Sequence, residues 1–220
     1  MPKADSLEAA LEAAIRRFDG TSPVTPQVHY HFGYAGDGAA AHKRLRMQLV
    51  LEVVAEEHGN AADGVDVACA VEILHESTVV HDSVESGAWS RFGLAHAINA
   101  GDAVSAMAYL QLLEGPPRRP PEQTVLMTRA LHAANFELCG GDKAAIFAVA
   151  CELGALVAGA SPERARAYAR LGRTCALALQ MEGDVQKATL AEADALASAA
   201  GIDAGGRVRA FFARVLRPAA

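Results

Sequence analysis

The residues with the clearest potential for chemistry lie between Ile73 and Gly87, in the sequence ILHESTVVHDSVESG. This stretch holds two histidines, one aspartate and two glutamates, and the apolar residues around it predict a helix that is buried on most sides. Buried helices carry few charged side chains, because each charge loses its hydration unless a partner compensates for it. The charges therefore indicate that this helix has a role beyond packing.

Other patterns with reactive side chains are weaker. The four cysteines lie far apart, form no CxxC or zinc spacing, and are expected to be reduced core residues. His29 and His31, in the sequence HYH, are expected to be polar loop residues rather than metal ligands. The sequences AGDG and AGDA are no phosphate loops, because neither follows a strand or carries Lys-Ser/Thr, and the chain has no Gly-x-Ser-x-Gly. None of these patterns predicts a catalytic centre.

Apolar residues recur at helical spacing along nearly the whole chain, and alanine is abundant. Helices are predicted over residues 6–18, 42–59, 63–86, 92–115, 122–140, 142–159, 161–201 and 204–218. The segment 161–201 opens with Ser-Pro-Glu, a good helix start, and is too long for one helix, so a break is expected near Gly183. No convincing strand or internal repeat is recognised. The pattern predicts an all-α helical bundle.

The amino-acid composition argues against several classes of protein. The 220 residues are 51% hydrophobic and 21% charged, which suffices for one core, so a single domain spanning 1–220 is expected. A net charge of -6 argues against binding of nucleic acid or anionic membranes. No apolar run reaches the roughly 20 residues of a transmembrane helix, and the N-terminus lacks the features of a signal peptide. We therefore expect a cytoplasmic protein.

Five segments occur in a fixed order between Tyr30 and Val185. They are YHFG with HKRLRMQLVL, EILHESTVVHDSVES, FGLAHAINAGDAVSAMA, GDKAAIFAVACELGALVAGAS and YARLGRTCALALQMEGDV. Together they resemble the trans-isoprenyl diphosphate synthases, the polyprenyl synthetase family. The resemblance implies an isoprenoid-synthase-like bundle around a central cleft. Compared with that family, the chain is shortened at SGAWSRFG, at LCGGDK and after the segment that ends at Val185.

The resemblance also implies a set of diphosphate-binding residues. They are Lys43, Arg46, His75, Lys143 and Gln180. Phosphate recognition requires cations and forked donors, and this set supplies both. The simpler alternative is that the residues from Lys43 to Arg46 form a solvated basic helix start and that His75 is a core histidine.

Members of the family ionise an allylic diphosphate, and Mg²⁺ bound by two aspartate-rich motifs neutralises the leaving pyrophosphate. The positions that match those aspartates hold Asp82, Ser83, Ser86, Gly183, Asp184 and Lys187. One carboxylate of three therefore remains in each motif. The lysine at the last position, Lys187, carries a positive charge and would repel a metal ion.

A reduced metal site is still conceivable on these residues. Asp82 and Glu85 are three residues apart on the predicted helix, so both can point the same way, and Asp184 would be the third ligand. Lys187, three residues after Asp184, can instead form an ion pair with it and repel a cation. The sequence thus makes Mg²⁺ a doubtful cofactor.

Two main hypotheses follow. The first is a divergent, catalytically impaired homologue that binds a prenyl diphosphate or acts as the regulatory partner of a full-length prenyl synthase. It would form a homodimer or heterodimer through the Ala- and Gly-rich residues 92–113. The alternative is an active prenyltransferase or terpene-synthase-like enzyme that acts on an allylic prenyl diphosphate with a remodelled metal site. In that case the small Ser77 and Thr78 imply an open product tunnel. A third hypothesis is a helical protein without any ligand, so the sequence leaves open whether the chain is an enzyme.

Overall fold

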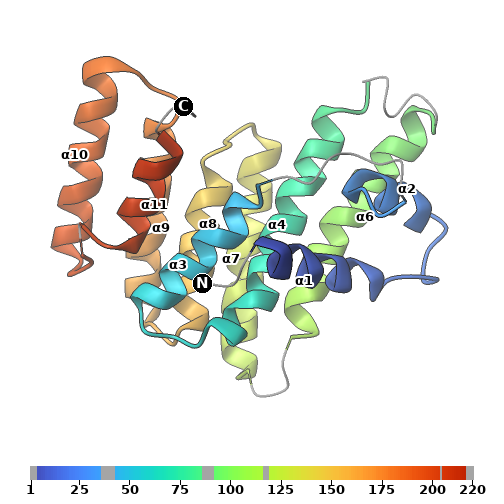
Figure 1. Cartoon of the computed structure of the whole chain (residues 1–220), viewed down its shortest axis with the longest axis horizontal. Helices are drawn as coiled ribbons and strands as arrows, with labels where there is room; N and C mark the ends of the chain where they lie inside the picture. Colours follow the sequence, from blue (N-terminus) through green and yellow to red (C-terminus); the bar gives the residue numbers. More distant parts are fainter. Residues whose placement is uncertain (1–3, 36–42, 86–91, 116–118, 204, 217–220) are drawn as a thin grey trace.

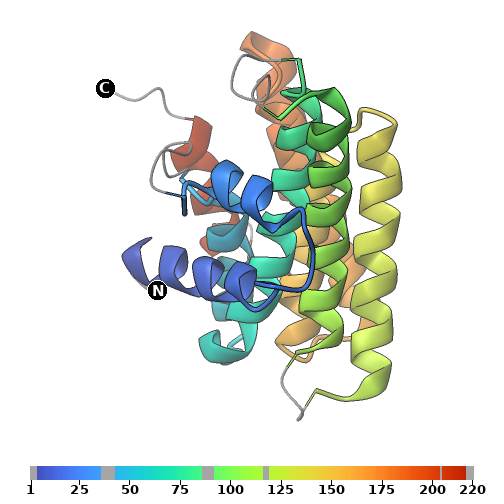
Figure 2. The same cartoon turned by 90° about the vertical axis from the view of Figure 1, so that its right-hand side faces the viewer.

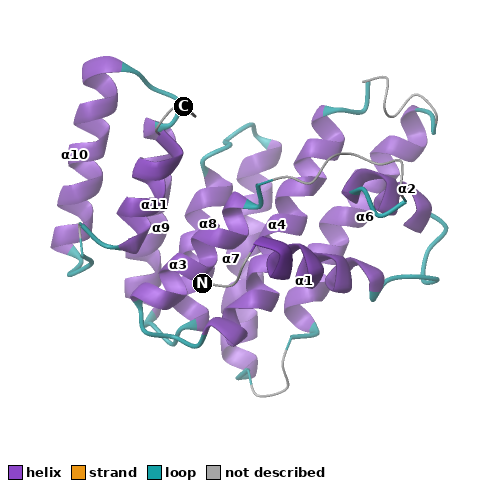
Figure 3. Cartoon of the chain, viewed as in Figure 1, coloured by secondary structure: helices purple, strands orange, loops and turns teal. Residues whose placement is uncertain are grey.

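The computed structural model describes residues 4–35, 43–85, 92–115, 119–203 and 205–216, and these residues form helices and no strand (Figures 1 and 3). The helices are α1 (Ala4–Arg16), α2 (Thr25–Phe32), α3 (Leu45–Glu56), α4 (Ala61–Asp82), α6 (Leu94–Leu113), α7 (Pro121–Cys139), α8 (Ala145–Val157), α9 (Pro162–Ala178), α10 (Gly183–Ala199) and α11 (Arg207–Leu216). The predicted all-α class is confirmed.

Helix α4 lies at the centre, where it packs on α1, α3, α6, α7 and α8 (Figure 1). On the far side of α8 the order continues outward through α9 to α10, while α11 packs on α3 and α9. The prediction that the helix from residue 63 is central is therefore confirmed. Although α4 and α6 are long, no helix in the described ranges is long and apolar enough to cross a bilayer.

Local sequence explains the starts of two helices, α4 and α9. The Asn60 side chain accepts a hydrogen bond from the Ala62 backbone N–H at 3.0 Å and begins α4, while Ser161 accepts one from Arg164 and begins α9. The expected break near Gly183 is confirmed, since α9 ends at Ala178 and α10 begins at Gly183. Helix α2 was missed, because the proline in its first turn looked like a breaker although proline is favoured there.

Glycines let the central helices approach closely. A Cβ on Gly154 of α8 would lie 2.8 Å from the Val50 carbonyl oxygen of α3. A Cβ on Gly172 of α9 would lie 2.8 Å from the Phe147 carbonyl oxygen of α8. Backbone atoms cannot move aside as a flexible side chain can, so these positions accept only glycine without a shift of the helices.

The cysteines are all free thiols, and three of them are core residues as expected. Cys69, Cys151 and Cys175 are buried, whereas Cys139 is exposed at the end of α7. The expectation of a core position is therefore wrong for Cys139. Burial raises the pKa of the Cys69 thiol to about 12, which makes it a poor nucleophile at neutral pH.

Candidate functional site

Two of the predicted site residues meet at one end of the bundle. The C-terminal end of α4 and the turn between α7 and α8 lie at the top of Figure 1, and both remain at the top in Figure 2. There the Lys143 Nζ donates a hydrogen bond to Oδ2 of Asp82 at 3.2 Å. Both side chains are largely exposed, so the ion pair is worth at most about 1 kcal/mol and opens readily for a ligand.

Arg46 lies close to the same end of the bundle. It is in the first turn of α3, and its guanidinium carbon is 5.1 Å from the ring centroid of Phe147, one helical turn after Lys143. Its Nε is buried and has no hydrogen-bond partner among the described residues. Burial lowers the pKa of Arg46, and the carboxylates of Glu72 and Glu76 act in the opposite direction. Arg46 thus offers an unused donor, while Lys43 lies exposed just before α3.

Between Lys43 and Arg46, Arg44 is the buried anchor of this segment. Its Nη1 donates to Glu76 at 2.6 Å, and its Nε donates to Glu8 at 2.8 Å. Glu76 also bonds the His31 ring at 2.8 Å, so α1, α2, α3 and α4 are joined by one network. Burial would raise the pKa of Glu8, but the hydrogen bond and charge of Arg44 hold it below its ordinary value. The alternative of a solvated basic helix start is wrong for Arg44.

The same network corrects the expectation for the two histidines of HYH. Both lie on α2 rather than in a loop, where His31 is buried against Glu76 and His29 contacts Asp19 at 2.7 Å. Sequence reasoning missed this network. The signal was present, since Glu72 and Glu76 share a face of a helix that was predicted to be buried, and buried carboxylates need cationic partners.

Glu72 is the most unusual carboxyl group in this region. It is fully buried, and its Oε2 accepts a hydrogen bond from the Met47 backbone N–H at 3.2 Å. Burial raises its pKa to about 7, although the nearby Arg46 charge acts to lower it. His75, three residues later on α4, is half-buried and lies two helical turns before Asp82, on the same face. It is a predicted diphosphate ligand whose role stays a prediction.

A cavity of about 370 Å³ opens beside Asp82, between α4, α6 and α7. Its walls come from Ser77, Thr78, His81, Asp82, Asp102, Ser105, Asn135, Leu138 and Cys139. The hydroxyls of Ser77 and Thr78 each donate to a backbone carbonyl of the preceding turn at 2.7 Å. Both residues therefore line the cavity with small side chains whose hydroxyl groups already have hydrogen-bond partners, and they leave space below Asp82.

The predicted metal ligands are not gathered in one place. Asp184 is 97% exposed at the start of α10 and bonds Lys187 at 3.1 Å, the ion pair expected from their spacing. Helices α8 and α9 lie between α10 and α4, which carries Asp82. Glu85 is exposed in the turn after α4, and Ser86 lies outside the described residues. Within the described part of the chain, no group of three or more His, Cys, Asp or Glu side chains could hold a metal ion.

Both matched aspartates have lysine partners, so binding a magnesium ion at either position would first require breaking an exposed ion pair. Gln180 is also separate from Lys143 and Asp82. It is exposed in the turn after α9 and lines a shallow hollow with Met181 and Leu216.

No protein-family model matches the chain. Among curated proteins, it is 28% identical over 199 residues to the geranylgeranyl diphosphate synthase of Mycobacterium tuberculosis, covering 74% of this chain and 57% of that protein. It is 27% identical over 201 residues to the geranylgeranyl diphosphate synthase of Sulfolobus acidocaldarius, covering 76% of this chain and 59% of that protein. The chain is thus similar to prenyl diphosphate synthases over about three quarters of its length. It spans somewhat more than half the length of these two relatives.

Two solved structures match the fold along almost the whole chain. An FPP/GFPP synthase from Zymomonas mobilis aligns with a TM-score of 0.71 and 18% identity, covering 98% of this chain and 100% of the other. The geranyl diphosphate synthase small subunit from Antirrhinum majus aligns with a TM-score of 0.65 and 16% identity, covering 98% of this chain and 99% of the other. The prediction of an isoprenoid-synthase-like bundle is confirmed.

Proposed function

We propose that this chain is a non-catalytic polyprenyl synthetase homologue of isoprenoid metabolism, which binds a prenyl diphosphate beside Lys143 and Asp82 and associates with a full-length prenyl synthase. The observation that carries this proposal is the pairing of both matched aspartates with lysines. Asp82 bonds Lys143 at 3.2 Å, and Asp184 bonds Lys187 at 3.1 Å. A lysine beside a carboxylate cancels the negative charge that attracts Mg²⁺, so the residues favour binding an anion over assembling a metal cluster.

Diphosphate binding is supported by the cations at this end of the bundle. Lys143 and Lys43 are exposed, and Arg46 has a buried Nε without a hydrogen-bond partner in the described ranges. When a diphosphate oxygen replaces Asp82 as the partner of Lys143, one charge-assisted hydrogen bond is exchanged for another at little cost. The cavity of about 370 Å³ beside Asp82 is of the size that holds small organic ligands, and it would take the prenyl chain.

Association with a synthase is supported by an apolar face on α6 and α7. The large exposed hydrophobic residues available on these two helices are Leu94, Ile98, Leu113, Val125 and Phe136, whereas Leu126 lines a groove between α7, α8 and α9 and Leu110 lines a pocket with α1 and α2. Phe136 is 83% exposed, which is unusual for a phenylalanine outside an interface. The likeness to a subunit titled geranyl diphosphate synthase small subunit motivates the choice of a synthase as partner.

The test combines binding and association. Calorimetric titration with farnesyl diphosphate, without added metal, should give measurable binding that weakens about tenfold in Lys143→Gln. Lys187→Gln is the matched control, because it removes an equally exposed, aspartate-paired lysine on α10 and should leave the affinity unchanged. Size-exclusion chromatography with a full-length prenyl synthase from the same genome should yield a mixed complex. A folded protein that neither binds the diphosphate nor joins the synthase would refute the proposal.

A second candidate function is an active prenyltransferase or terpene-synthase-like enzyme on the same site. It is favoured by the small Ser77 and Thr78 on the wall of the cavity, which leave room for a growing or cyclising chain. Because Asp184 lies apart, Asp82 and Glu85 would then have to hold any metal ion, and fixed cations would stabilise the leaving group. Release of pyrophosphate from geranyl, farnesyl or geranylgeranyl diphosphate in the presence of Mg²⁺ decides between the two functions.

A further inference from the structure

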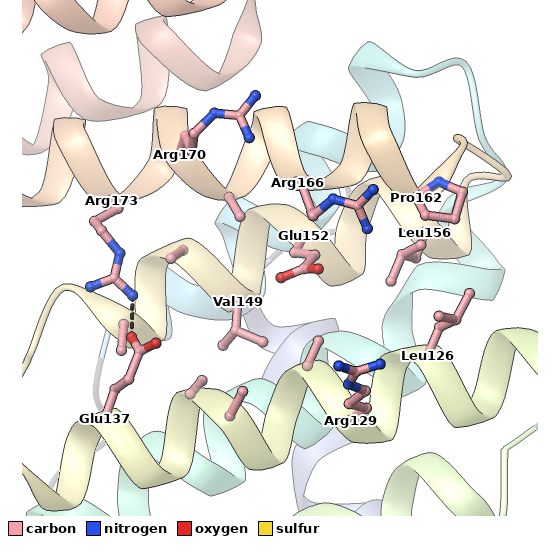
Figure 4. Close-up of a pocket in the computed structure, with 16 residues that line it drawn as sticks. Leu126, Arg129, Glu137, Val149, Glu152, Leu156, Pro162, Arg166, Arg170 and Arg173 are labelled. Carbon is pink, nitrogen blue, oxygen red and sulfur yellow. Dashed lines mark hydrogen bonds and ion pairs between the residues drawn. The ribbon is translucent and has the colours of Figure 1, made fainter.

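A second groove lies between α7, α8 and α9, with a volume of about 340 Å³ (Figure 4). Its floor consists of small and apolar residues, namely Leu126, Ala130, Ala133, Ala134, Ala145, Ala148, Val149, Leu156, Pro162 and Ala169. The residues of α8 that line it recur at helical spacing. Phe147 and Gly154, which contact α3 residues, lie on the other side of α8. The groove shares no lining residue with the cavity beside Asp82 and is separate from it.

Four arginines border this groove. Arg129 comes from α7, and Arg166, Arg170 and Arg173 come from α9. Arg173 is occupied by ion pairs with Glu137 and Asp142, and Arg166 has an exposed pair with Glu163. Arg129 and Arg170 have no ion pair or hydrogen bond to another described residue. In Figure 4 the side chain of Arg129 extends from α7 toward the groove.

Glu152 lies in the middle of the groove, on α8, and shows how poorly hydrated this region is (Figure 4). It is half-buried, and no hydrogen bond joins its carboxylate to another described side chain. Burial raises the pKa of Glu152, while the charge of Arg166 acts to lower it. An anion in the groove would therefore meet guanidinium groups at the rim and a floor from which water is partly excluded, where such contacts are strong.

We propose that the α7–α8–α9 groove is a second ligand site, which takes an amphipathic organic anion with its phosphate or carboxylate on Arg129 and Arg170 and its apolar body on the alanine floor. The arginines specify the charge of the ligand, since guanidinium groups bind phosphate and carboxylate oxygens through paired N–H donors. The floor specifies the apolar body, because alanine and other apolar residues make up most of it and Glu152 is its one polar side chain among the described residues. A helix of a partner, about 10 Å wide, is too bulky for about 340 Å³, whereas a small molecule fits.

The test is calorimetric titration of the full chain with n-dodecyl phosphate below its critical micelle concentration. Farnesyl monophosphate and inorganic phosphate serve as comparison probes. We expect binding of both amphiphiles and at least about tenfold weaker binding of inorganic phosphate, which lacks the apolar body. Equal affinity for the two amphiphiles would mean that the groove accepts any apolar chain of suitable length. Tighter binding of one of them would show whether the groove prefers a saturated or a prenyl chain.

Two variants locate the site. Arg129→Gln should weaken dodecyl phosphate binding about tenfold, and Ala133→Leu should do so by filling the exposed floor. The matched controls are Arg16→Gln and Ala188→Leu, which make the same changes on exposed positions of α1 and α10 and should alter the affinity less than about twofold. Far-UV circular dichroism and the melting temperature establish that all four variants fold.

The proposal is overturned if dodecyl phosphate does not bind, or if the two groove variants behave like their controls. It is also overturned if binding survives Arg129→Gln and Ala133→Leu but is lost in Lys143→Gln, because the ligand would then lie beside Asp82. Conversely, groove binding that persists in Lys143→Gln supports the second site even if farnesyl diphosphate fails to bind beside Asp82.

Discussion

Replacing Arg44 by methionine tests the buried network that holds the segment between Lys43 and Arg46 in place. The Arg44 and Glu76 side chains are only 5% and 1% exposed, so this substitution leaves a buried carboxylate with His31 as its main polar partner. Removing one member of a buried ion pair costs about 3–5 kcal/mol. Position 44 has a left-handed backbone, with φ 48°. Arginine and methionine are strained to a similar extent in this conformation, so the change in stability reports the loss of the Arg44 side-chain contacts.

The assay is urea unfolding at neutral pH, followed by circular dichroism. The double variant Arg44→Met/Glu76→Gln should recover about 2 kcal/mol of that loss, because the uncompensated charge is removed together with its partner. Arg16→Met is the control, since Arg16 forms an exposed pair with Glu12 one turn away and should cost less than about 1 kcal/mol. If Arg44→Met costs no more than Arg16→Met, or if the double variant recovers nothing, Arg44 does not anchor this segment.

Three further predictions follow from other parts of the structure. Because the pKa of Glu72 is about 7 in the folded protein and 4.5 when unfolded, its contribution to stability is present below pH 4.5 and lost as pH rises through 7. Urea titrations should therefore show that Glu72→Gln raises the unfolding free energy relative to wild type, by up to about 3 kcal/mol more at pH 8 than at pH 4. The same difference between variant and wild type at both pH values would contradict a buried carboxyl group with a raised pKa. Gly154→Ala should cost about 1–3 kcal/mol by pushing α8 from α3, whereas Gly205→Ala, whose Cβ would meet only the Asp203 side chain at 3.5 Å, should change the melting temperature little. Phe136→Asp should abolish co-elution with a synthase without lowering the melting temperature, and an unchanged complex would exclude this face as the interface.

Helical periodicity and helix-start residues predicted the fold well, because these are local signals. The Ser-Pro-Glu start of α9, the break at Gly183 and the central position of α4 all follow from residues that lie within a few positions of one another. Helix α2 was missed because a short segment with two prolines looks like a loop unless the position of proline in the first turn is considered.

The site was harder to predict, because its contacts join residues that are distant in the chain. Motif matching identified Lys143 and Asp82, and the structure brings them into contact across 61 positions. It gave no indication that Arg44 turns inward to Glu76. The arginine-bordered groove was also missed, because Arg129 and Arg170 belong to different helices whose packing no local pattern specifies.

The most direct test of the proposed function is one titration of the purified chain with farnesyl diphosphate, with and without Mg²⁺, while pyrophosphate release is monitored with isopentenyl diphosphate present. The lysine-paired aspartates predict binding of similar affinity in both conditions, weakened in Lys143→Gln, with no pyrophosphate released. Magnesium-dependent release of pyrophosphate, lost in Asp82→Asn, would contradict the proposal and establish an active enzyme.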